Sequence, residues 1–243
     1  MTDMKNFVIK VAGINVGIST QSTGTYGYCI SYLTDETPEV HVSVTQADVD
    51  DLFSSSLIAQ QYDNPAYLES IAVYVKIIEA LLDYNCFMMH GAVVAIGNEA
   101  WMFSANSGTG KTTHIKQWIR NIDGAYVVNG DKPIIRIVND QIYVCGTPWY
   151  GKERLGTNTM VPLKGIAFLK RNESNCIREM PFSEAYLSLL QHVHVPHDPD
   201  QAKKTLRLLQ QLDSKVSYYD FKVNNFKDDC LQVAYNAMVG KRE

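Results

Sequence analysis

The chain has 243 residues, of which 46% are hydrophobic and 20% are charged, an ordinary globular composition. Its formal net charge of −4 argues against a nucleic-acid-binding surface, and no apolar run approaches the roughly 20 residues of a membrane span. The amino terminus lacks a signal-peptide pattern, and the five cysteines include no CxxC pair. We therefore expect a cytoplasmic protein with buried thiols and with no nucleic-acid or membrane partner.

The first 60 residues predict a β-rich segment. NFVIKVAGINVGIST, residues 6–20, has β-branched residues on both sides of Gly13, which predicts two strands joined by a turn. EVHVSV, residues 39–44, alternates apolar and polar side chains and predicts a third strand. Between them, residues 21–28 are rich in turn-forming types and predict a loop.

Two helices are expected next. The first covers about 47–60, and either Thr45 or Asp48 would cap it. The second covers 64–85, where Asn64 would be the cap, a proline follows in the first turn, and apolar residues occupy most faces.

The pattern changes to strands at residue 86. Residues 86–96 and 99–105 predict two strands, and the Gly97-Asn98 pair between them indicates a hairpin. Residues 111–122 then predict a helix with one apolar side.

The remaining elements alternate between strands and helices. GAYVVNGD predicts a strand ending near Asp131, and 132–146 predicts a hairpin that turns at Asn139-Asp140. After an irregular stretch at 146–160, we expect strands at 163–171, 176–181 and 215–223, and helices at about 183–192, 199–213 and 226–239.

No repeat or linker interrupts this order, so a single domain over 1–243 is predicted. Within it we distinguish a β-rich part at 1–60, a nucleotide-binding core at 86–170 and a mostly helical part at 181–243.

A glycine-rich stretch before the third helix carries the strongest functional signal. ANSGTGKT begins at Ala105 and matches the phosphate-loop pattern G-x-x-x-x-G-K-[ST] at every fixed position but the first. The alanine methyl is tolerated if φ there is negative. Such a loop aims backbone N–H groups at phosphate oxygens, a lysine pairs with the β- and γ-phosphates, and a threonine hydroxyl binds Mg²⁺. The predicted nucleotide-binding residues are Ser107, Gly108, Thr109, Gly110, Lys111, Thr112 and Thr113.

Predicted hairpins on both sides of the loop indicate a mixed or antiparallel sheet, unlike the parallel sheet of a doubly wound fold. HGAVVAIGNEAWMFSANSGTGKTT, which starts at His90, resembles the core of the HPr serine kinase/phosphorylase family. Its loop is also similar to that of ATP-dependent phosphoenolpyruvate carboxykinase. The resemblance covers roughly 86–150, and VNGDKPIIRI and GTPWYGKERLGTN resemble small kinase-like proteins of that superfamily. It implies an α/β fold with a mixed β-sheet core and flanking helices, not a Rossmann fold.

Asp131, at the end of a predicted strand, is the candidate for holding Mg²⁺ or accepting a hydroxyl proton. Its alternative role is to cap a turn. The family resemblance implies two adjacent acids at this place, whereas this chain has Gly130 before Asp131. We expect Gly130→Asp to raise activity if the backbone there does not need a positive φ.

The same resemblance places His90 near the γ-phosphate, although a lone histidine on an apolar strand is more often a core residue. The irregular stretch 146–158 offers Lys152 and Arg154 for phosphate or acceptor binding, and Glu153 as a replacement for the missing acid; its alternative is a surface loop with a buried tryptophan. A cluster of three histidines at 192, 194 and 197 lacks further ligands, which argues against a metal site.

The sequence thus predicts an ATP-dependent kinase that uses Mg²⁺ and transfers the γ-phosphate to a hydroxyl. The resemblance favours a serine on a protein or peptide as the acceptor, while a small-molecule acceptor fits equally well. The catalytic residues would be Lys111, His90 and Asp131, with Thr112 and Asp131 on the metal. The alternatives are a module that binds ATP without transferring phosphate, and an ATPase. The sequence is also compatible with a homo-oligomer.

Overall fold

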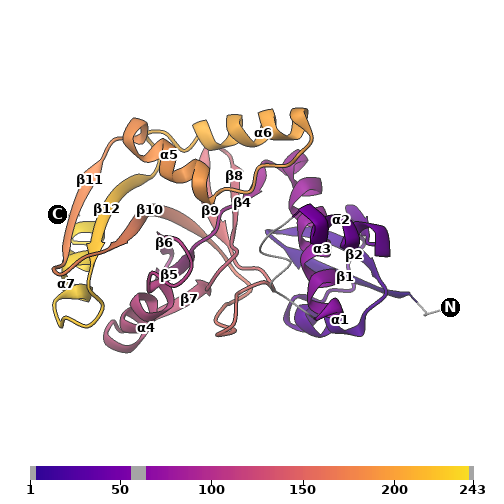
Figure 1. Ribbon diagram of the computed structural model, residues 1–243, viewed down its shortest axis with the longest axis horizontal. Helices are drawn as coiled ribbons and strands as arrows, with labels where there is room; N and C mark the ends of the chain where they lie inside the picture. The colour runs from indigo at the N-terminus through magenta and orange to yellow at the C-terminus, as the bar shows by residue number, and fades with distance from the viewer. Residues whose placement is uncertain (1–3, 56–63, 241–243) are drawn as a thin grey trace. The chain divides into compact units, whose positions relative to one another are not determined.

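The computed structural model describes residues 4–55 and 64–240. By its internal contacts the chain divides into two compact units, Met1–Tyr84 and Asn85–Glu243 (Figure 1). The sequence did not indicate this division, because no stretch rich in glycine, proline or serine separates the two units. None of the helices in the described residues is long and apolar enough to cross a membrane.

The first unit contains a three-stranded sheet in the order β1-β2-β3. The predicted strands are confirmed as β1 (Lys5–Val11), β2 (Ile14–Thr20) and β3 (Val40–Ser43). β1 and β2 are antiparallel and joined at Ala12-Gly13, where both residues have positive φ, while β3 runs parallel to β2.

The loop predicted for 21–28 was wrong. This stretch forms the helix α1 (Thr23–Cys29), which is followed by a 3-10 turn. The Ser22 hydroxyl accepts a hydrogen bond from the Gly24 N–H and caps the helix. A carboxylate from the distant Glu69 binds the backbone just before it. Because Glu69 is 47 residues from Ser22 in the sequence, the local composition of 21–28 does not reveal this contact.

The two other helices of this unit are α2 (Gln46–Ser55) and α3 (Pro65–Ala80). Thr45 and Asp48 both take part in capping α2, since the carboxylate accepts from the threonine N–H at 2.7 Å. The predicted end of α2 near residue 60 lies outside the described residues. Asn64 caps α3 as predicted, because its Oδ1 accepts from the N–H groups of the first turn.

The second unit is built on one mixed sheet of nine strands. Its main path has the order β4-β8-β9-β10-β6-β5-β7, while β12 joins β10 and β11 joins β12. The strands are β4 (Cys86–Met88), β5 (Ala92–Ile96), β6 (Glu99–Ser104), β7 (Ala125–Asn129), β8 (Ile134–Val138), β9 (Gln141–Cys145), β10 (Met160–Arg171), β11 (Cys176–Met180) and β12 (Ser217–Val223). The mixed α/β class with flanking helices is confirmed.

The strand predicted for 86–96 is in fact two strands. β4 pairs with β8, whereas β5 pairs with β6 and β7, so the chain changes partners at residues 89–91. His90 lies in this break, where its N–H donates to the His192 carbonyl at 2.7 Å and its carbonyl accepts from the Ser104 hydroxyl at 2.7 Å.

Strand directions bring four chain segments to one edge of the sheet. β10 is parallel to both β6 and β12, and β7 runs in the same direction because both it and β6 are antiparallel to β5. Their carboxyl ends therefore share an edge, at Ser104, Asn129, Arg171 and Val223. The residues that follow these four ends build the candidate site.

Helices cover both faces of this sheet. α4 (Lys111–Asn121) and α7 (Cys230–Met238) pack on one face, and α5 (Phe182–His192) packs on the other (Figure 1). Alternation along β12 shows the two faces, since Tyr218 contacts the ring of Phe182 whereas Tyr219 and Phe221 join the core under α4 and α7. α6 (Pro199–Gln210) follows α5.

We expect Asn64→Ala to lower the free energy of unfolding of the first unit by about 1 kcal/mol, because two N–H groups of α3 lose their acceptor. Urea unfolding followed by circular dichroism measures the change. Asn64→Asp, which keeps the acceptor, is the control; equal losses in both variants would contradict a capping role.

Candidate nucleotide-binding site

The glycine-rich loop joins β6 to α4 at the shared edge. Gly108 and Gly110 have φ of 78° and 111°, values that disfavour any residue with a side chain. Ala105 is buried and its φ is not positive, so the methyl group in place of the first glycine causes no backbone strain. The first turn of α4 leaves the N–H groups of Lys111, Thr112 and Thr113 without acceptors inside the helix.

Two residues from neighbouring strand ends hold the loop from outside. The Arg171 guanidinium, at the end of β10, donates to the Gly108 carbonyl. The Asn225 amide, just after β12, donates to the Gly110 carbonyl at 3.1 Å, and it lies where a side chain at Gly110 would be. Sequence reasoning missed both residues, because neither belongs to a motif and strand direction alone brings them to the loop.

The Lys111 ammonium is folded into the loop. The residue is only 8% exposed, and Nζ donates to the Ala105 carbonyl at 2.7 Å and to the Asn106 carbonyl at 3.4 Å. Nζ also lies 3.0 Å from Nε2 of His90. Burial lowers the pKa of Lys111 because it disfavours the charged form, while the nearby Asp131 opposes this shift.

His90 connects Lys111 to Asp131. Burial first, and the Lys111 charge second, lower the pKa of His90 to about 4, so the imidazole is neutral at pH 7. An ammonium is only a donor, so Nε2 must accept from Lys111 and Nδ1 carries the proton. Nδ1 lies 3.4 Å from Oδ1 of Asp131. The structure thus brings together all three residues predicted to be catalytic.

Asp131 is carried by a tightly bonded turn. Oδ1 of the buried Asn129 accepts from the N–H groups of Asp131 and Lys132, both at 2.8 Å. The amide of Asn129 donates to the carbonyl and hydroxyl of Thr147. The Lys132 ammonium pairs with Oδ2 of Asp131. Asn129 and Thr147 are positioning residues that sequence reasoning missed, although an asparagine followed by a glycine is a known turn signal.

Gly130 has no space for a side chain. A Cβ there would lie 2.8 Å from the Tyr150 carbonyl oxygen and 3.1 Å from that of Leu155, both of them backbone atoms. The φ of Gly130 is not positive, so the obstacle is steric and not conformational. The expectation that an acid here would raise activity must therefore be corrected, because the segment 150–155 would have to move.

This segment belongs to the irregular stretch 146–158, which lies against the end of β7. Trp149 is buried, and the exposed Glu153 pairs with Lys116 of α4 at 2.6 Å. Lys116 lies one helical turn after Thr112, so Glu153 is held near the same side of the helix.

The other two candidates of this stretch lie on the outside. Lys152 and Arg154 are both exposed. Their neighbour Gly151 lies against Asp131, since a Cβ there would be 2.9 Å from Cβ of Asp131. The backbone of this stretch therefore reaches the acid, while the two charged side chains are exposed.

A cavity of about 320 Å³ opens beside the loop on the α5 face of the sheet. His192 links it to the site, since its ring stacks on Phe168 and has its centroid 6.4 Å from that of His90. Burial and the Lys111 charge lower the pKa of His192. The other lining residues are Ser104, Ala105, Asn106, Thr109, Leu169, Lys170, Arg171, Ser188 and Gln191.

His192 shares no metal site with His194 and His197. Within residues 4–55 and 64–240, no three His, Cys, Asp or Glu side chains are grouped to hold a metal ion.

The helix after the loop is fixed by a buried histidine. His114 is fully buried, its Nε2 accepts from the Trp118 indole at 3.0 Å, and its Nδ1 lies 3.4 Å from Sγ of Cys230. Burial lowers the pKa of His114 to about 4. This contact joins α4 to α7 and was not expected from the sequence.

Comparison with known proteins gives little more. No protein-family model and no curated protein matches the chain. Among solved structures, one similar chain is the HPr(Ser) kinase/phosphatase from Coxiella burnetii, with 12% identity and a TM-score of 0.36 over 61% of this chain and 88% of that one. This likeness is too weak to define a shared fold or function.

We expect Gly130→Asp to destabilise the protein, since its Cβ would collide with two backbone carbonyls. The midpoint of thermal unfolding measures the effect. Gly27→Asp is the matched control, because a Cβ at Gly27 meets nothing within 4 Å. Equal midpoints for the two variants would show that the segment 150–155 yields easily.

We also expect stability to fall as the pH drops below about 6.5. Between the unfolded pKa of 6.5 and the folded pKa of about 4, the unfolded state binds a proton that folded His114 does not. By linkage, His114 alone would cost about 2 kcal/mol between pH 7 and about pH 5. Urea unfolding at both pH values tests this, and His114→Gln should remove that part of the loss. An unchanged pH dependence in His114→Gln would contradict the assignment.

Proposed function

We propose that this protein is an ATP-dependent kinase that transfers the γ-phosphate of ATP to a hydroxyl, most fittingly a serine of a protein or peptide. The observation that carries the proposal is the chain of contacts from Lys111 through His90 to Asp131, set at a glycine-rich loop before a helix. We further propose that the mixed sheet belongs to the HPr kinase and phosphoenolpyruvate carboxykinase-like architecture, on the strength of the sequence resemblance.

The loop would bind the phosphate chain through backbone N–H groups at the start of α4. Lys111 already lies within the loop, so a phosphate oxygen would replace the Ala105 or Asn106 carbonyl as its acceptor. Neutral His90 adds no positive charge, but its contact with Nζ orients the ammonium. Arg171 and Asn225 would keep the loop in shape as the nucleotide binds.

The donors near the loop fit a magnesium ion held mainly by phosphates. Mg²⁺ typically takes one or two carboxylates and a hydroxyl from the protein and fills its other positions with phosphate oxygens and water. Thr112 and Asp131 are such donors, and Glu153 pairs with Lys116, which lies one helical turn after Thr112. When bound, the ion would neutralise charge on the β- and γ-phosphates.

In the transfer step, the acceptor oxygen bonds to the γ-phosphorus while the bond to the β,γ-bridging oxygen breaks. ADP leaves with that electron pair, and the hydroxyl proton passes to a carboxylate. Asp131 would accept this proton; its two oxygens lie next to His90 and Lys132, which supports this role. Most of the catalysis would come from positioning and charge neutralisation.

The acceptor would enter through the cavity beside the loop. Its wall at His192 lies next to His90, and Ser188 and Gln191 offer neutral hydrogen-bonding groups. Lys170 and Arg171 also line the cavity. Lys170 pairs with Asp220 at 2.9 Å, and the Arg171 charge favours an acceptor with acidic groups near the reacting hydroxyl.

A second function, ATP binding without transfer, is favoured by one observation. Gly130 leaves a single carboxylate at the strand end, and that carboxylate is already paired with Lys132. In this reading the protein would be a nucleotide sensor within a larger assembly.

Phosphorus NMR with Mg²⁺-ATP and candidate acceptor peptides tests the proposal. We expect wild-type protein to move the γ-phosphate to a new species, and Asp131→Asn to bind ATP with turnover reduced at least about a hundredfold. Lys111→Ala should lose the thermal stabilisation that ATP gives to the wild type. Lys203→Ala, in the exposed part of α6, is the control and should behave as wild type.

The outcomes separate the functions. Binding that leaves ATP intact with every acceptor would favour the sensor, and release of inorganic phosphate without an acceptor would favour an ATPase. Thermal stabilisation that is unchanged in Lys111→Ala would contradict the phosphate loop itself.

A further inference from the structure

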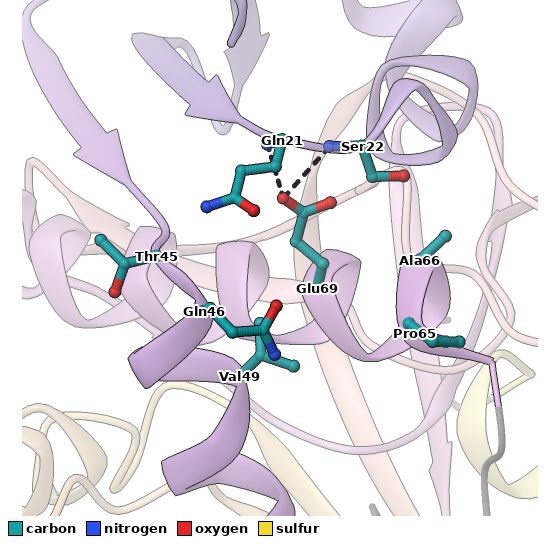
Figure 2. A pocket seen from close by; sticks show the side chains of 8 residues that line it. All are labelled: Gln21, Ser22, Thr45, Gln46, Val49, Pro65, Ala66 and Glu69. Carbon is teal, nitrogen blue, oxygen red and sulfur yellow. Dashed lines mark hydrogen bonds between the residues drawn. The ribbon is translucent and has the colours of Figure 1, made fainter. Parts of the chain in front are cut away.

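A second cavity, of about 330 Å³, lies wholly within the first unit (Figure 2). Thr45, Gln46 and Val49 form one side of it, and Pro65 and Ala66 form the other. Glu69 of α3 lies between these sides, below the backbone of Gln21 and Ser22. Nothing in the kinase proposal uses this cavity.

Glu69 is a buried carboxylate with one oxygen unmatched. The residue is only 6% exposed, and Oε1 accepts from the N–H groups of Gln21 at 2.6 Å and Ser22 at 3.2 Å. Oε2 is buried and has no hydrogen-bond partner among the described residues. An unmatched buried acceptor costs roughly 1–3 kcal/mol, and more when it is charged, so this oxygen favours an added donor.

The described lining of the cavity offers hydrogen-bond acceptors. Within residues 4–55 and 64–240, no lysine, arginine or histidine lines it, and the remaining polar groups are the neutral side chains of Gln21, Ser22, Thr45 and Gln46. Lys76 of α3 is engaged elsewhere, with Asp48 and the Ser43 carbonyl. The charge balance therefore favours a cationic ligand.

Three helices begin at this cavity, which in principle would favour an anion. Their free N–H groups are, however, already capped from within the chain. The Ser22 hydroxyl accepts from α1, Thr45 and Asp48 bond to each other at α2, and Asn64 accepts from α3. Few donors remain for an anion, while the Glu69 carboxylate would repel it.

We propose that this cavity binds a primary ammonium group, which donates to Oε2 of Glu69. The neutral amides and hydroxyls would take its other hydrogens, and Val49, Pro65 and Ala66 would pack against an aliphatic stem. The volume exceeds that of several water molecules, so a lysine side chain or a small free amine fits. Both sources share the same chemistry.

Titration followed by amide chemical shifts in ¹⁵N NMR tests the proposal. The probes are n-butylammonium, for a free amine, and N-acetyl-lysine methylamide, for a lysine side chain. We expect saturating shifts at Gln21, Ser22 and Gln46 with a Kd of about 10 mM or lower. The neutral isostere n-butanol should bind at least tenfold more weakly. Saturation by only one of the two amines identifies the source.

Two variants separate the ammonium site from general adhesion. Glu69→Gln keeps an acceptor for the Gln21 and Ser22 N–H groups but removes the charge, so affinity for the amine should fall at least tenfold. Gln46→Trp leaves Glu69 in place and narrows the opening of the cavity from an exposed position, so it should also lose binding of the amine. This variant keeps the test available if Glu69→Gln fails to fold. Equal binding of butanol and butylammonium, no saturable shift, or undiminished binding in Gln46→Trp would overturn the proposal.

Discussion

The candidate site depends on the need of a buried ammonium for hydrogen-bond acceptors. Lys111 is almost fully buried, and an unpaired charge in such a place would be strongly destabilising. Two loop carbonyls and His90 provide its acceptors. This requirement fixes the tautomer of His90, and the protonated Nδ1 then lies 3.4 Å from Oδ1 of Asp131. The Lys111 ammonium thereby connects the glycine-rich loop with His90, in the break between β4 and β5, and through His90 with Asp131 after β7.

Backbone packing limits the number of carboxylate side chains that the end of β7 can carry. The stretch 146–158 lies so close to the end of β7 that only glycine fits at position 130. The presence of glycine, and not a second acid, before Asp131 is therefore a steric consequence of this stretch. The same stretch brings Glu153 to Lys116 on α4. A second carboxylate, if the chemistry requires one, would have to come from the stretch 146–158 and not from the end of β7.

The two units treat buried charge in related ways. In the second unit, the Lys111 ammonium donates to acceptors within the chain, so its hydrogen-bonding needs are met. In the first unit, Glu69 satisfies one oxygen with backbone N–H groups and leaves the other without a partner. A complete network stabilises a fold, whereas an incomplete one at a cavity wall favours a ligand.

The sequence by itself determined the local elements and the loop. Hydrophobic periodicity predicted most strands and helices, Asn64 marked the start of one helix, and Asn139-Asp140 marked one hairpin turn. These signals act over only a few residues. The phosphate-loop pattern indicated Lys111 for the same reason. Only tertiary structure decided the rest. Strand direction and pairing, which depend on contacts far apart in the chain, split residues 86–96 in two and brought Arg171, Asn225 and His192 to the loop. Long-range packing likewise supports the helix at 23–29, where a loop was expected, and closed position 130 to any side chain.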